Sequence, residues 1–147
     1  MTPQPKFVLF GLFLLLSVPL MGWAEEAVTA EEETSEEQGI TDYIAMEPSF
    51  VTHVGVPGGK LTYLKAAVSL RASKQTTRPA VEAHMPRLRH ELVMLFGEQT
   101  DADMLTTMDG QKALREEAKS RINGVLDEQQ TGEVITGVLF TEFVVQK

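Results

Sequence analysis

The stretch that decides the fold is GEVITGVLFTEFVVQ, residues 132–146, close to the end of the chain. It is dense in β-branched and aromatic residues, which favour a strand. As a regular strand it would carry Val134, Val138, Phe140 and Val144 on one face, and Ile135, Leu139, Phe143 and Val145 on the other. A strand that is apolar on both faces needs cover on both sides or a neighbour at each edge, so the pattern predicts a central strand. Gly137 and Glu142 interrupt the pattern. Gly137 is predicted to mark a bulge, and Glu142 a position at the rim of the sheet.

A β-hairpin is predicted between residues 43 and 71. The segment 43–54, YIAMEPSFVTHV, is extended but is interrupted by Pro48, which restricts its first half to a sheet edge or a loop. Pro57, Gly58 and Gly59 supply the residues of a tight turn. The segment 60–71, KLTYLKAAVSLR, then alternates apolar and polar residues. This alternation predicts a strand with one buried face and one wet face.

Helical periodicity dominates residues 79–126. Apolar residues recur at spacings of three and four from Val81 to Leu95, and Pro86 within this run predicts a kink or a restart of the helix. A short helical turn is expected at 101–108. A last helix is predicted over 110–126, capped by Asp109, with Leu114, Ala118, Ile122 and Val125 on its inner face. The element order predicts an α+β fold, in which two or three helices pack on one face of a small antiparallel sheet.

The amino-terminal segment indicates export. Residues 7–24, FVLFGLFLLLSVPLMGWA, form an apolar run after Lys6, which is typical of a signal peptide or a membrane anchor. Pro19 and the small residues Gly22 and Ala24 fit cleavage after Ala24, whereas Trp23 fits the interfacial belt of an anchor. We therefore predict a signal peptide or anchor at 1–24, an acidic disordered linker at 25–39 and an exported domain at 40–147. The domain would face the periplasm from the inner membrane, or lie free in the periplasm if residues 1–24 are cleaved.

Charge is distributed unevenly along the chain. The formal net charge is −8 and there is no cysteine, which excludes disulfides and thiolate metal sites. Seven glutamates and no basic residue lie between Glu25 and Glu37. From Gln38 onward twelve Lys and Arg residues face fourteen Asp and Glu residues. A domain so close to neutral lacks the basic face that binding to nucleic acid requires.

Two short motifs resemble catalytic or binding signatures but lack essential residues. His90-Glu91 begins a helical zinc motif, yet Met94 stands where the second histidine belongs. Residues 55–60, GVPGGK, are one residue short of a phosphate-binding loop, and Leu61 replaces the Ser or Thr that would hold magnesium. No serine, histidine and acid group can be assembled from the sequence. We therefore expect no enzyme activity, no catalytic residue, no metal, no cofactor and no small-molecule substrate.

The pattern as a whole resembles the FliL family of flagellar basal-body proteins. The resemblance covers about residues 40–146 and is most specific in VLFTEFVVQ, residues 138–146, with support from 43–54, 85–89, 110–115 and Ile122-Asn123. The residues that carry the motif are Val138, Leu139, Phe140, Thr141, Glu142, Phe143 and Gln146, together with Gly110, Leu114 and Asn123.

The resemblance implies a fold related to stomatin and prohibitin and a ring of copies at the membrane. It also implies contacts with the flagellar stator and basal-body proteins, in support of rotation, swarming and chemotactic motility. The alternative is an exported scaffold protein of the same fold that has no flagellar role.

Overall fold

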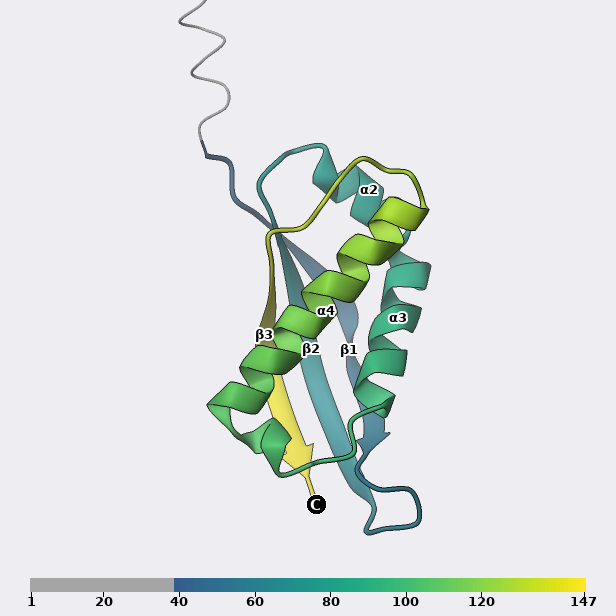
Figure 1. Cartoon of the computed structure of the whole chain (residues 1–147). Helices are drawn as coiled ribbons and strands as arrows, with labels where there is room; N and C mark the ends of the chain where they lie inside the picture. The colour runs from purple at the N-terminus through teal and green to yellow at the C-terminus, as the bar shows by residue number, and fades with distance from the viewer. Residues whose placement is uncertain (1–38) are drawn as a thin grey trace, which may run out of the picture. The chain divides into compact units, whose positions relative to one another are not determined.

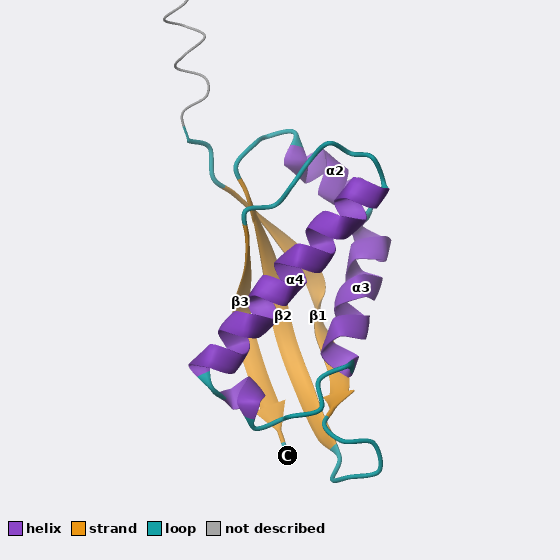
Figure 2. Ribbon diagram, viewed as in Figure 1, coloured by secondary structure: helices purple, strands orange, loops and turns teal. Residues whose placement is uncertain are grey.

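The computed structural model describes residues 39–147, which fold into a three-stranded sheet and a layer of helices (Figures 1 and 2). The elements in chain order are β1 (Asp42–Val54), β2 (Thr62–Ala72), α2 (Thr77–Ala83), α3 (Met85–Gly97), the 3₁₀ helix η2 (Met104–Thr106), α4 (Met108–Glu128) and β3 (Gly137–Gln146). The predicted signal peptide or anchor and the acidic linker lie outside the described residues. The α+β fold is confirmed, whereas its relation to stomatin and prohibitin stays a prediction.

The order of the strands corrects one prediction from the sequence. Both strand pairs are antiparallel and the order is β1-β2-β3, so the middle position belongs to β2. The carboxy-terminal strand is therefore an edge strand, and its prediction as the central strand is wrong. Helices α3 and α4 lie on the same face of the sheet (Figure 2).

A bulge in β3 explains why its sequence suggested two apolar faces. Ala67 is opposite Glu142 and Val68 is opposite Phe140, so Thr141 is an extra residue in β3. An extra residue shifts the side-chain alternation by one position, and residues on the two sides of the bulge exchange faces. The residues that face the helices are consequently Val138, Phe140, Phe143 and Val145. The predicted bulge at Gly137 is wrong, because Gly137 is the first residue of the strand.

The predicted hairpin is confirmed. Residues 55–61 join β1 to β2, and Gly55 and Gly58 have φ angles of 105° and 81°, which glycine adopts without strain. The alternation of β2 appears as predicted, with Thr62, Leu64, Ala66, Val68 and Leu70 buried. The pairing between β1 and β2 is irregular between Met46 and Phe50, the interval that contains Pro48.

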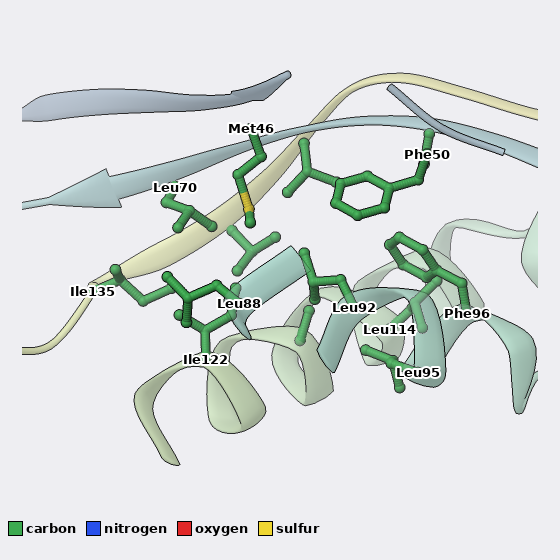
Figure 3. Packing of buried hydrophobic residues seen from close by; sticks show 14 of the residues in the cluster. Met46, Phe50, Leu70, Leu88, Leu92, Leu95, Phe96, Leu114, Ile122 and Ile135 are labelled. Atoms are coloured by element: carbon green, nitrogen blue, oxygen red, sulfur yellow. The ribbon is translucent and has the colours of Figure 1, made fainter. Parts of the chain in front are cut away.

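The core lies between the inner face of the sheet and the helices α3 and α4 (Figure 3). Leu88, Leu92, Leu95 and Phe96 of α3 are at most 1% exposed. The Phe96 ring meets the Phe50 ring of β1 edge to face, with the ring centroids 5.5 Å apart. Aromatic pairs in this geometry add to the stability that burial alone provides.

Proline divides the predicted first helix in two. Helix α2 ends at Ala83, and α3 restarts at Met85 with Pro86 in its first turn. Because the first turn of a helix has no carbonyl partner for its N–H groups, the missing N–H of proline costs nothing there. The predicted restart is confirmed.

Helix α4 is confirmed, but its cap differs from the prediction. The hydroxyl of Thr107 accepts a hydrogen bond of 3.0 Å from the Gly110 N–H, so Thr107 and not Asp109 is the cap. Thr107 has an extended backbone, as a capping residue requires, whereas Asp109 already lies in the first helical turn. The predicted inner residues Leu114, Ala118, Ile122 and Val125 are buried.

Candidate interaction surface

The carboxy-terminal motif divides between the two faces of the sheet. Val138, Phe140 and Phe143 face the helices, and the rings of Phe140 and Phe143 stack with their centroids 4.9 Å apart. Leu139, Glu142 and Gln146 are exposed on the other face. Thr141 lies at the bulge, and its hydroxyl donates to the carbonyl oxygen of Ala67 at 3.3 Å. The motif thus contributes Val138, Phe140 and Phe143 to the core and exposes Leu139, Glu142 and Gln146 to solvent.

Asn123 fixes the entry to β3. Its Oδ1 accepts a hydrogen bond of 2.8 Å from the Ile135 N–H, and its Nδ2 donates to the Ile135 carbonyl at 3.2 Å. The amide therefore binds both backbone groups of a residue whose side chain is 2% exposed. This contact holds the segment before β3 against α4, which assigns a structural role to Asn123.

Gly110 and Leu114 belong to the contact between η2 and α4. A Cβ atom placed on Gly110 would lie 1.9 Å from the Met104 carbonyl oxygen, so only glycine allows the two backbones to approach this closely. Leu114 is 4% exposed in the core. Gly110 and Asn123 lie near opposite ends of α4, so the structure does not gather the motif residues into one chemical site.

The charged face of α3 and α4 is held by arginines. The Arg121 guanidinium contacts Glu98 at 2.6 Å and Glu117 at 2.9 Å. The hydrogen bond from Arg121 lowers the pKa of Glu98, and the two carboxylates raise the pKa of Arg121. These groups are exposed to solvent, which screens their charges, so the pairs contribute little to stability.

The incomplete zinc motif is part of the same charged face. The Glu91 carboxylate accepts a hydrogen bond of 2.7 Å from Arg87, four residues earlier. His90 is exposed on α3. Among residues 39–147 no group of three or more potential metal-ligating side chains comes together.

A shallow groove on the open face of the sheet was not predicted. It encloses about 520 Å³ and is lined by Val51, Tyr63, Lys65, Glu142, Val144 and Gln146, from all three strands. Val51 is 65% exposed and Val144 47%, so both of these apolar side chains face solvent. The sequence indicated part of this surface, because Tyr63 and Lys65 lie on the predicted wet face of residues 60–71, but only the strand order brings them beside Val144.

Three of the six residues that line the groove carry charged or amide side chains: Lys65, Glu142 and Gln146. Lys65 and Glu142 form an ion pair of 3.2 Å across it, and the His53 and Tyr63 rings pack with their centroids 4.7 Å apart. Because the two charges satisfy each other, the groove presents mainly apolar and aromatic surface. Exposed apolar surface of this kind marks interaction sites on proteins.

Within residues 39–147, none of the helices combines the length and the apolar character that crossing a membrane requires. The predicted anchor falls outside this range, so the finding concerns the domain alone.

Comparison with known proteins identifies the family. The sequence is 25% identical to the flagellar protein FliL of Escherichia coli (strain K12) over 142 residues, which cover 97% of this chain and 90% of the relative. The flagellar proteins FliL of Escherichia coli O157:H7 and of Shigella flexneri match with the same identity and coverage. The profile of the family described as "Flagellar basal body-associated protein FliL" matches residues 43–146, almost the whole of the described domain. The chain therefore belongs to the FliL family of flagellar basal body-associated proteins.

Proposed function

We propose that this chain is a non-enzymatic accessory protein of the flagellar basal body that acts at the stator. In this role it supports flagellar rotation, swarming and chemotactic motility through protein contacts. The observation that carries the proposal is the family match, because it extends from residue 43 in β1 to residue 146 at the end of β3. The surface supports this role, since the groove on the open face of the sheet is mainly apolar and its two charged residues pair with each other.

The proposal places the domain on the periplasmic side of the inner membrane. Residues 1–24 would hold or deliver it there, and the glutamates of residues 25–37 would keep it away from the anionic lipid surface. Copies confined to one patch of membrane reach a high effective concentration, so weak contacts between domains suffice for assembly. A ring of copies around the stator would favour the engaged state of the stator by binding that state more tightly.

The test is a clean deletion of the gene, scored for swarming and for swimming in viscous medium. We expect a smaller swarm radius and normal assembly of filaments, with recovery when the full chain is supplied in trans. The matched control is a complementing chain with His90→Ala and Glu91→Ala, which alters the incomplete zinc motif and should restore motility fully. Deletion without any effect on motility would refute the proposal and favour the exported scaffold without a flagellar role.

A further inference from the structure

Helix α4 has a flank on each side of its buried row, and the two flanks differ in how their charges are satisfied. One flank faces α3, and there the Arg121 guanidinium contacts Glu98 at 2.6 Å. The other flank faces β3 (Figure 1), because Asn123 on it binds the backbone of Ile135. This β3 flank consists of four half-buried residues spaced four apart, Gln111, Arg115, Lys119 and Asn123.

The two ends of the β3 flank are bound to backbone, but its middle is not. Gln111 donates to a backbone carbonyl of η2 at 3.1 Å, and Asn123 holds the segment before β3. Between them, Arg115 and Lys119 form no ion pair with any of residues 39–147. The flank therefore presents two cations that the described part of the chain does not neutralise.

Arg115 and Lys119 also repel each other. They are four residues apart in α4, and like charges at this spacing lie on one face and destabilise a helix. On the flank toward α3 the same spacing joins opposite charges, since Arg121 contacts Glu117 at 2.9 Å. An anion placed between Arg115 and Lys119 would convert their repulsion into two attractions.

The strand beside this flank adds apolar surface. Phe140 and Phe143 stack with their ring centroids 4.9 Å apart, and both are only partly buried. Glu142 is the single charged residue of β3, and it lies on the opposite face of the sheet, where it pairs with Lys65. A ligand along the β3 flank would thus meet two cations beside partly exposed aromatic rings, without repulsion from a carboxylate of β3.

We propose that the β3 flank of α4 binds an acidic polypeptide segment of another protein, with Arg115 and Lys119 contacting its carboxylates. The planar guanidinium of arginine matches a carboxylate with two parallel hydrogen bonds, and lysine adds a second positive charge one helical turn away. The proposal goes beyond the role at the stator and does not rest on it, because its test measures binding and not motility.

The charge of the whole helix favours a narrow acidic chain over an anionic lipid surface. Helix α4 contains four basic residues, Lys112, Arg115, Lys119 and Arg121, against five acidic ones, Asp109, Glu116, Glu117, Asp127 and Glu128. A flat layer of phosphates would approach many of these charges at once and gain little net attraction. A polypeptide can follow the β3 flank alone and avoid the carboxylates on the outer face of the helix.

The test measures the binding of a fluorescein-labelled peptide of eight glutamates to the full chain, held in micelles of an uncharged detergent. The test variant combines Arg115→Gln with Lys119→Gln and so removes both cations. The matched control combines Lys60→Gln with Lys74→Gln. It removes the same charge from two loops, at lysines that also have no ion pair within residues 39–147.

We expect fluorescence anisotropy to give a dissociation constant about tenfold weaker for the test variant, and a change of at most about twofold for the control. Arg115→Lys keeps the charge and should bind nearly as well as the unchanged chain. Equal midpoints of urea denaturation show that all variants are folded. Equal weakening in the test variant and the control, or no binding to the unchanged chain, would overturn the proposal.

A competition experiment separates the acidic polypeptide from a lipid headgroup. Unlabelled octaglutamate and a soluble, short-chain phosphatidylglycerol are each titrated against the bound labelled peptide, at equal concentrations of negative charge. We expect the peptide to displace the label at least about tenfold more efficiently than the lipid. Displacement by the lipid that is equally efficient would mean that the flank takes anionic headgroups, and the proposal would then be wrong.

Discussion

Strands β1 and β3 occupy equivalent places at the two edges of one sheet, yet the chain treats them differently. Strand β1 has a buried inward row, and two arginines bond its carbonyl groups. Strand β3 has a half-buried inward row and a bulge, and its entry is held by one amide side chain. The difference teaches that a strongly apolar strand need not be the centre of a sheet, because a bulge can turn its apolar residues toward one face.

The largest effect is expected from the aromatic residues of the two edges. Phe50→Ala should lower the free energy of unfolding by about 3–5 kcal/mol, because it removes a buried ring that packs against Phe96. Phe140→Ala should cost about half as much, since part of that ring is already in contact with water. Urea denaturation of the full chain measures both. A larger loss for Phe140→Ala than for Phe50→Ala would contradict the comparison.

The next largest loss of stability is expected on removing the contact between Asn123 and Ile135, which anchors the start of β3. Asn123→Ala should cost about 1–3 kcal/mol, because the Ile135 N–H and carbonyl would lose the partner that binds both. Asn123→Asp is the informative control: it keeps the acceptor for the N–H and loses the donor to the carbonyl. We expect amide exchange to accelerate at the start of β3 and to stay unchanged in β1. Uniform acceleration across both strands would show that Asn123 does not anchor β3 locally.

A smaller loss of stability is expected on replacing Arg89, which covers part of the β1 edge. Arg89 donates to the Met46 carbonyl, and its guanidinium carbon lies 4.2 Å from the centroid of the Phe50 ring. Arg89→Met keeps much of the apolar stem but loses both interactions, and should cost about 0.5–1.5 kcal/mol. The same variant should aggregate more readily, since it frees a carbonyl group on an edge strand. Light scattering during refolding, with Arg115→Met as the control, checks the second expectation.

The smallest effect is expected from lowering the pH, which weakens the contact between Asp42 and Arg78. The hydrogen bond from Arg78 holds the pKa of Asp42 below its ordinary value of 3.8, so this carboxylate stabilises β1 above that pH. The contribution should be lost as the pH falls below 3.8 through the folded pKa, because the unfolded chain then binds the proton more readily. The anchor of β3, Asn123, is a neutral amide and does not titrate, although hydrogen bonds from Thr76 and Thr77 also lower the pKa of Glu133, two residues before Ile135.

Protection factors at the start of each strand, measured at pH 5 and at pH 3, test this difference. We expect a fall at β1 in the unchanged chain and no further fall at β1 in the Asp42→Asn variant. An equal fall at β1 in the Asp42→Asn variant would contradict the assignment of the acid response to the contact between Asp42 and Arg78.

Much of the local structure could be predicted from the sequence. The alternation of residues 60–71 and the spacing of Leu114, Ala118, Ile122 and Val125 depend on the fixed periods of strand and helix. Turn chemistry at residues 57–59 and the restart near Pro86 depend on the backbone limits of glycine and proline. The family could also be recognised, because residues 138–146 are distinctive in order and not only in composition.

The interaction surface was less accessible to prediction. Tyr63 and Lys65 were expected to be wet, but nothing local indicates that Val144 lies beside them across the sheet. Asn123 was identified through the family resemblance, and its contact with Ile135 required the position of α4 against the end of the loop. The cap at Thr107 was missed because Asp109 is an equally good capping residue by type, and the backbone conformation decides between them.

By itself, the sequence determined which segments are strands and helices, that the domain is close to neutral, and to which family it belongs. Only the tertiary structure decided that β3 lies at an edge and that its side chains change faces at Thr141. The physical reason is that side-chain period is a property of one strand, whereas a bulge is defined by the residues of the neighbouring strand. Strand order likewise depends on which backbone groups find partners, and the hydrophobicity of a single segment does not specify its neighbours.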